Sequence, residues 1–342
     1  MDRIAFFKVT ILLLVPIAAG AAYWLWKILR AHKGIATALS ALLLILIFYQ
    51  VYDNNRVVVK QETVFVQDLP PEFEGFEILQ ISDLHGKSFG RDQAGLTSKI
   101  NAIDYDMIAF TGDMETESQT FGPFVALLDG IENKENMFYI NGNTDLAYKY
   151  LSGIKTEAGK FLEDHGCILL NAPYPIMRSG KTLWLADDLS TAYVNINVYQ
   201  GVPRNYFRSD EQYRAYQQHF AELIALADRI RNNEDIKIAL SHIPHTQSEL
   251  EQKDLPVNIW DSDLILAGHN HGGQIRIPFY GALFIPARSS FYDGFLPDQK
   301  YVSGLVAGND VQQYVSRGLG ASNLRFRLFN TPEINLLILR AK

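Results

Sequence analysis

Short apolar runs recur along this chain, and each one ends in a turn of glycine and polar residues. Five such runs cover residues 76–81, 107–110, 137–140, 236–240 and 264–267. Continuous apolar runs between turn signals are typical of strands buried on both faces, and the helix-length segments that separate them favour βαβ units. The pattern predicts an α/β domain with parallel strands.

Residues that can bind metals follow every one of these runs. The five turns read Ser82-Asp83-Leu84-His85, Thr111-Gly112-Asp113, Asn141-Gly142-Asn143-Thr144-Asp145, Ser241-His242 and Gly268-His269-Asn270-His271-Gly272-Gly273. Functional sites of open α/β sheets assemble beyond the carboxyl ends of the strands, where all five turns are expected. Any one of these residues alone could cap a helix or support a turn, but their common position favours a shared site.

The chemistry of the donors indicates which ligand they bind. The candidate metal ligands are Asp83, His85, Asp113, Asn143, His242, His269 and His271. They offer carboxylate, amide and imidazole groups and no thiolate, which favours Mn, Fe, Zn or Mg. Seven ligands are too many for one tetrahedral ion, but they suit two ions about 3.5–4 Å apart that share a carboxylate. The sequence therefore predicts two divalent metal ions.

In this order the motifs resemble a known family, the calcineurin-like metallophosphoesterases. The motifs are Asp83-x-His85, Gly112-Asp113, Gly142-Asn143, His242 and Gly268-His269-x-His271, and the resemblance extends over about residues 75–340. The membrane-attached bacterial branch is the most similar, because its chains also end in segments like 316–320 and 330–334. The resemblance implies a metallophosphoesterase-type four-layer α/β/β/α sandwich.

The same resemblance implies a role for each ligand. Asp83, His85, Asp113 and His271 would hold the first metal, and Asp113, Asn143, His242 and His269 would hold the second. The catalytic residues would be Asp113, Asn143 and His242, with a hydroxide between the ions attacking phosphorus in line. The expected substrate is a phosphate ester.

Thr144 departs from the family pattern. Most members carry a histidine after the Gly-Asn pair, where it can protonate the leaving oxygen, and a threonine hydroxyl is too weakly acidic for that task near neutral pH. A related branch, the UDP-2,3-diacylglucosamine pyrophosphohydrolases, also lacks this histidine, and its leaving group needs little protonation. The departure favours pyrophosphate or activated diester substrates, or else reduced activity. Thr144 and His245 are the candidate contacts with the leaving group or substrate, although His245 is also typical of a residue that supports a turn.

The N-terminus carries two long apolar stretches, at about residues 9–26 and 35–52. Each approaches the ~20 residues that span a bilayer, so we expect a transmembrane hairpin in residues 1–60 and a phosphoesterase domain in residues 61–342. A cleaved signal peptide with a small-residue site at 18–22 is the alternative for the first stretch. Lys27, Arg30 and Lys33 in the connecting loop favour the cytoplasm, which places the catalytic domain on the extracytoplasmic side of the cell membrane.

Charge and cysteine content narrow the range of partners. The chain has a net charge of −7, and its basic residues are in excess only before residue 60, so the predicted domain is acidic and nucleic-acid binding is not expected. A single cysteine excludes an intramolecular disulfide. The expected partners are a lipid bilayer and a phosphate ester.

Together these patterns predict a membrane-anchored phosphohydrolase with a binuclear metal centre, acting on a phosphodiester or pyrophosphate ester, including esters of lipids. Two alternatives remain open. One is a phosphomonoesterase for soluble substrates, and the other is a catalytically weak metal-binding protein with a structural or sensory role.

Overall fold

A computed structural model of the chain describes residues 23, 27, 30, 32–115, 122–145, 147–148, 153–188, 203–231, 233–251, 262–285, 294–309, 311–322 and 326–342. The chain divides into two compact units, Met1–Tyr52 and Asp53–Lys342. The expected boundary near residue 60 stays a prediction.

The N-terminal unit contains most of helix α2 (Lys33–Asn55), which includes the apolar stretch 35–52. This helix has 23 residues and a mean hydropathy of 2.1, and none of its most apolar window is buried. By length and composition it can cross a membrane, although a signal sequence near an N-terminus has the same features. The other expected span, at 9–26, lies outside the described residues except for Tyr23. The two-helix hairpin is therefore not confirmed.

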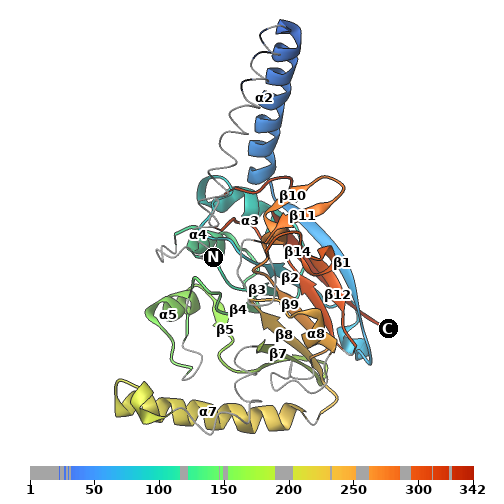
Figure 1. Ribbon diagram of the computed structural model, residues 1–342. Helices are drawn as coiled ribbons and strands as arrows, with labels where there is room; N and C mark the ends of the chain where they lie inside the picture. Colours follow the sequence, from blue (N-terminus) through green and yellow to red (C-terminus); the bar gives the residue numbers. More distant parts are fainter. Residues whose placement is uncertain are drawn as a thin grey trace, which may run out of the picture. The chain divides into compact units, whose positions relative to one another are not determined.

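The second unit is built on two six-stranded sheets (Figure 1). The first has the order β1 (Val58–Val66), β14 (Glu333–Ala341), β2 (Glu77–Ile81), β3 (Met107–Phe110), β4 (Met137–Tyr139), β5 (Cys167–Leu169). The second has the order β12 (Gly304–Ala307), β13 (Gln312–Val315), β9 (Leu264–Ala267), β8 (Ile236–Ser241), β7 (Lys181–Asp187), β6 (Tyr174–Arg178). Strands β2 to β5 run parallel to one another, and so do β7, β8, β9 and β13. The expected α/β fold with parallel strands is confirmed.

Each of the five apolar runs forms a strand, namely β2, β3, β4, β8 and β9. Every residue of β3, β4, β8 and β9 is buried, because both faces of the strands are covered. One face of each sheet packs against the other sheet, through a cluster that joins Ile78 and Met107 to Leu240 and Leu266.

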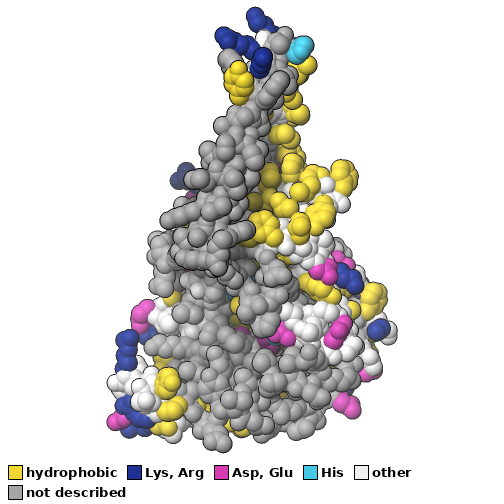
Figure 2. Space-filling model, in the orientation of Figure 1, with side chains coloured by type: hydrophobic (Ala, Val, Ile, Leu, Met, Phe, Trp, Pro, Cys, Tyr) yellow, Lys and Arg dark blue, Asp and Glu magenta, His cyan; other side chains and the backbone are white. Residues whose placement is uncertain are grey.

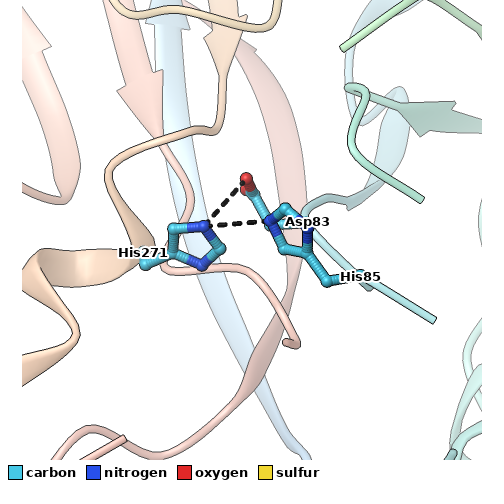
Figure 3. Close-up of side chains that lie close together, drawn as sticks. All are labelled: Asp83, His85 and His271. Atoms are coloured by element: carbon cyan, nitrogen blue, oxygen red, sulfur yellow. Dashed lines mark hydrogen bonds and ion pairs between the residues drawn. The ribbon is translucent and has the colours of Figure 1, made fainter. Parts of the chain in front are cut away.

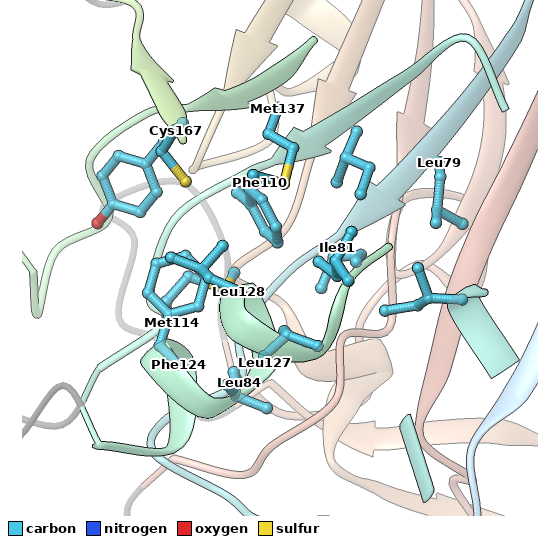
Figure 4. Packing of buried hydrophobic residues seen from close by; sticks show 14 of the residues in the cluster. Leu79, Ile81, Leu84, Phe110, Met114, Phe124, Leu127, Leu128, Met137 and Cys167 are labelled. Carbon is cyan, nitrogen blue, oxygen red and sulfur yellow. The ribbon is translucent and has the colours of Figure 1, made fainter. Parts of the chain in front are cut away.

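Helices pack on the outer faces of both sheets. The first sheet is covered by α3 (Ala94–Ile100), α4 (Gly122–Gly130) and α5 (Glu157–Asp164), and Figure 4 shows Phe124, Leu127 and Leu128 of α4 against Phe110 and Ile81. The second sheet packs against α7 (Asp210–Arg231) and α8 (Gln247–Glu251). The expected ligands lie in the turns that follow β2, β3, β4, β8 and β9, so they come from both sheets.

Candidate metal centre

The loops that carry the expected ligands have an unusual backbone. Asp83, His85, Asp113, His269 and His271 all have positive φ angles, between 48° and 68°. This left-handed conformation is unfavourable for residues with a side chain, and such strain is concentrated at functional sites. Five of the seven expected ligands are therefore held in strained turns directly after strands.

The first group of ligands combines both sheets. Asp83 and His85 follow β2, whereas His271 lies in the short helix η4 (His271–Gly273) after β9. The ring nitrogens Nε2 of His85 and His271 are 3.1 Å apart, and His271 Nε2 lies 3.7 Å from Asp83 Oδ1. Figure 3 shows the three side chains converging on one point. We call these three residues group 1.

The second group also combines both sheets. It consists of Asp113 after β3, His242 directly after β8 and His269 after β9, and we call it group 2. His242 Nε2 lies 3.0 Å from His269 Nδ1 and 2.9 Å from the side-chain oxygen of Asn143. The seven expected ligands thus all lie in or beside these two groups.

Asp113 faces both groups. Its Oδ2 atom is 3.5 Å from His85 Nε2 and 3.3 Å from His242 Nε2. Its other oxygen, Oδ1, accepts hydrogen bonds of 2.9 Å from the backbone N–H and from the hydroxyl group of Thr144. The carboxylate is therefore held with Oδ2 directed between the two groups.

The spacing of the donor atoms fits metal ligation. Metal–nitrogen bonds of about 2.1 Å that meet at about 90–110° place two ligand nitrogens about 3.0–3.4 Å apart. The two pairs of facing ring nitrogens, at 3.1 and 3.0 Å, match this range. Within each group the donor atoms all lie within 4.8 Å of one another. The structure thus has two groups that could each hold a divalent ion.

Two glycines allow the loops after β3 and β4 to approach this closely. Gly112 has a φ of 84°, and a side chain there would come within 2.7 Å of the Gly142 backbone. A side chain at Gly142 would lie 2.1 Å from Asp113 Oδ1. A larger residue at Gly142 would displace the Asp113 carboxylate, and one at Gly112 would push the two loops apart.

Asp145 joins the same two loops and was not recognised from the sequence as a functional residue. Its buried carboxylate accepts hydrogen bonds from the backbone N–H groups of Gly142, Asp113 and Met114, at 2.8, 3.0 and 2.6 Å. The position directly after Thr144 was a signal, because an aspartate beside a Gly-Asn turn can bond to backbone amides.

The histidines differ in their affinity for protons. Burial, assisted by the charge of His242, lowers the pKa of His269 to about 4, and burial also holds the pKa of His271 well below its usual value. Burial alone would lower the pKa of His242 too, but the facing Asp113 carboxylate outweighs it and raises that pKa to about 9. His269 and His271 are therefore neutral and ready to bind a metal at neutral pH, whereas His242 must first lose a proton.

The two expected substrate contacts are already hydrogen-bonded to other residues. The Thr144 hydroxyl faces Asp113 Oδ1 and, at 3.0 Å, the carbonyl oxygen of Glu115. His245 lies with Nε2 2.8 Å from a carboxylate oxygen of Asp188, and this carboxylate raises the pKa of His245 in spite of burial. Both interactions are typical of residues that orient their neighbours.

Arg327 is the other residue that the sequence did not reveal. Its fully buried guanidinium donates hydrogen bonds to the carbonyl oxygens of His271, Gly320, Arg317 and Asn330, at 2.6 to 3.1 Å. Asn330 also donates to the His271 carbonyl, at 2.7 Å. The backbone of one group 1 ligand is thus fixed by residues close to the C-terminus.

Comparison with known proteins identifies the class that this fold and these two groups define. Residues 76–273 match the calcineurin-like phosphoesterase family, so the chain belongs to that family, and the resemblance seen in the sequence is confirmed. The protein is accordingly a metal-dependent phosphoester hydrolase.

Individual relatives cover most or part of the chain. It is 28% identical to the metallophosphoesterase YkuE of Bacillus subtilis (strain 168), over 84% of this chain and 87% of that protein. It is 25% identical to the UDP-2,3-diacylglucosamine pyrophosphatase LpxG of Chlamydia muridarum, over 79% and 86%. It is also 36% identical to the phosphodiesterase YaeI of Escherichia coli (strain K12), over 30% and 31%.

Proposed function

We propose that the protein is a membrane-anchored, two-metal phosphohydrolase that cleaves a phosphodiester or pyrophosphate ester, including esters of lipids. One observation carries the two-metal proposal. Asp113 Oδ2 lies 3.5 Å from a ring nitrogen of group 1 and 3.3 Å from one of group 2, so a single carboxylate can serve two ions.

In this proposal Asp83, His85, Asp113 and His271 hold the first ion, and Asp113, Asn143, His242 and His269 hold the second. Two bound divalent ions would supply a strong nucleophile from water at neutral pH and offset the charge that develops on phosphoryl oxygens. The chain's own contribution is to keep the donor atoms converged, which the strained turns and buried packing support.

The preference for a pyrophosphate or diester rests on Thr144. We assign its hydroxyl to positioning the Asp113 carboxylate, and it is too weakly acidic to protonate a leaving alkoxide. His245 would contact a leaving group only if its pairing with Asp188 opened. A nucleotide phosphate, by contrast, leaves without needing a proton, so a pyrophosphate ester suits a site without a general acid. The relatives named as a pyrophosphatase and a phosphodiesterase also support a pyrophosphate or diester substrate.

Membrane attachment rests on the N-terminal unit. The apolar side chains of α2 are exposed along its length, and the second unit begins at Asp53, one residue after the last apolar residues of this helix. We propose that residues 1–60 form an anchor of two spans at about 9–26 and 35–52, that residues 61–342 form the four-layer phosphoesterase domain, and that this domain lies outside the cytoplasm. A reporter enzyme that is active only outside the cytoplasm, fused after Lys342, tests the last point. We expect this fusion to be active.

A substrate panel tests the function itself. The full-length protein, loaded in turn with Mn, Fe, Zn or Mg, would be assayed on an aryl phosphomonoester, an aryl phosphodiester and a nucleotide-linked diacyl pyrophosphate. We expect the highest kcat/KM on the pyrophosphate and the lowest on the monoester, with Asp113→Ala as the background. A preference for the monoester would support the alternative of a phosphomonoesterase for soluble substrates. No turnover with two metals bound would support the alternative of a catalytically weak metal-binding protein with a structural or sensory role.

A further inference from the structure

A small β-hairpin directly after the metal-ligand loop exposes apolar residues. Strands β10 (Ile275–Ile277) and β11 (Gly281–Phe284) are antiparallel, and the turn between them carries Phe279 and Tyr280. Phe279 is fully exposed and has a φ of 68°, an unfavourable conformation for an aromatic residue. The turn therefore directs a large apolar side chain into solvent at a cost in backbone energy.

A second segment extends this surface. Residues 294–296 pair with β11, because Leu296 N–H donates to the Leu283 carbonyl at 2.9 Å and Phe284 forms a bridge with Phe295. Phe295 and Leu296 are 69% and 60% exposed. We call the five exposed residues of the two segments, Ile277, Phe279, Tyr280, Phe295 and Leu296, the apolar rim.

The apolar rim is a continuous feature of the surface. Figure 2 shows hydrophobic side chains gathered over the area where Figure 1 places β10 and β11. Scattered single apolar residues are ordinary on a protein surface, but a contiguous group of large ones marks a contact with a membrane or another molecule. The apolar rim is therefore a candidate contact surface.

Hydrogen bonds connect the apolar rim to the start of the second unit, Asp53–Lys342. At its base, Arg276 N–H donates to the Leu328 carbonyl at 2.9 Å, and Leu328 N–H donates to the Gln274 carbonyl at 3.0 Å. The preceding residue, Arg327, donates its N–H to the side chain of Asn54 at 2.8 Å, and Asn54 donates back to the Arg327 carbonyl. Asn54 is only two residues after Tyr52, the last residue of the N-terminal unit.

This connection favours a bilayer as the partner of the apolar rim. Two residues of chain reach at most about 7 Å, so a bilayer that holds α2 up to Tyr52 has its surface close to Asn54 and hence to the base of the hairpin. Aromatic and aliphatic side chains such as those of the rim are the groups that enter the interfacial region of a bilayer. We propose that the apolar rim docks on the surface of the same bilayer that holds α2.

Docking of the apolar rim would place the candidate metal centre close to substrates in the membrane interface. The hairpin begins two residues after η4, which contains the candidate ligand His271, and Arg276 donates to the carbonyl of Gly272 at 2.6 Å. A docked rim would hold this loop at the level of the lipid headgroups. The site would then meet phosphoryl groups that lie in the membrane interface in preference to those free in solution. This inference rests on the proposed membrane attachment.

Depth-dependent fluorescence quenching in the full-length protein tests the proposal. Single cysteines introduced by Phe279→Cys and, separately, Leu296→Cys would carry an environment-sensitive label, and the native Cys167 is buried and does not compete. The protein would be reconstituted in vesicles of phosphatidylethanolamine and phosphatidylglycerol, with and without spin-labelled lipids. We expect both labels to shift to the blue and to lose fluorescence to shallow spin labels, as for groups about 5–10 Å into the interface.

Two further positions separate the possible failures. Met177→Cys lies on β6 and is 72% exposed, which makes it the matched apolar control that should not be quenched. Leu44→Cys lies in α2 and should be quenched by deep spin labels if this helix is in the bilayer. Quenching at Leu44 with Phe279 and Leu296 no different from Met177 overturns the docking of the rim alone. No quenching at Leu44 overturns the membrane attachment and, with it, this inference.

Discussion

Groups 1 and 2 are built from the same kinds of side chain but are held by different parts of the molecule. In group 1 the backbone of His271 is fixed by Arg327 and Asn330, which come from the C-terminal segment. In group 2 the support comes from the strand loops themselves, since His242 Nδ1 lies 2.9 Å from the Thr111 carbonyl and Asp113 is held by Thr144. The two groups therefore depend on different residues far apart in the sequence.

They also differ in protonation. His271 in group 1 is kept neutral, because burial holds its pKa well below the usual value. In group 2 the Asp113 carboxylate raises the pKa of His242 to about 9 against the effect of burial. A metal can therefore enter group 1 without removing a proton from His271, whereas entry into group 2 displaces the His242 proton.

Removing the carboxylate that faces both groups should have the largest effect. Asp113→Ala is expected to lower kcat by about 10³-fold or more, since each ~1.4 kcal/mol of lost transition-state stabilisation costs a factor of ten. His85→Ala should act on group 1 first. The measurement is steady-state hydrolysis of an aryl phosphodiester with saturating metal, and near-normal turnover by Asp113→Ala would exclude a shared ligand.

The next effect tests the support of group 1. Arg327→Met should destabilise the fold, because four carbonyl oxygens lose a hydrogen-bond donor at a cost of about 1–3 kcal/mol for each that stays unsatisfied, and it should weaken metal binding in group 1 more than in group 2. Denaturant unfolding and metal titration measure the two effects. Arg340→Met removes an exposed arginine that bonds to Glu74 and serves as the control. Equal losses from both groups would contradict the separate support.

The pH dependence of metal binding sharpens the comparison further. The pKa of His242 is raised, so its proton stabilises the metal-free fold below its ordinary pKa, and this stability is lost as the pH rises through about 9. Metal binding must displace that proton, and the affinity of group 2 should fall about tenfold for each unit of pH below about 9. Group 1 should show a shallower dependence at neutral pH. Calorimetric titration with metal at several pH values compares the two groups, using His271→Ala to leave group 2 and His269→Ala to leave group 1. Identical slopes of log affinity against pH in the two variants would contradict the proposed difference in protonation.

The smallest effect concerns Thr144. Thr144→Val removes a hydroxyl hydrogen bond to Asp113 Oδ1, and we expect a loss of about 0.5–1.5 kcal/mol, equivalent to a fall in kcat/KM of about tenfold at most. Thr144→Ser keeps the hydroxyl and should retain most of the activity. If both variants lost activity equally, the hydroxyl would have no role in positioning Asp113.

The strands and the ligand loops were predictable because their signals are local. A continuous apolar run such as 264–267, followed by Gly268-His269, identifies a buried strand and its functional turn without knowledge of the rest of the fold. The family was recognisable for the same reason, since its motifs are short and ordered.

The rest depends on contacts between distant segments. β14 lies between β1 and β2 although about 250 residues separate it from β2 in the sequence, and no local pattern determines such pairing. Arg327 belongs to a surface-like mixture of polar and apolar residues, and only the fold shows that its guanidinium is buried against four carbonyl groups. The position of Asp113 Oδ2 between His85 and His242 likewise depends on how the two sheets pack together.

The metal content of the full-length protein tests the central claim most directly. Elemental analysis of the purified wild type, after loading with a single divalent metal, should give two ions per chain, and Asp113→Ala should bind fewer at both groups because both lose a ligand. Glu251→Ala, which changes an acidic residue outside both groups, should keep two. One ion in the wild type, or two in Asp113→Ala, would contradict a binuclear centre that shares this carboxylate.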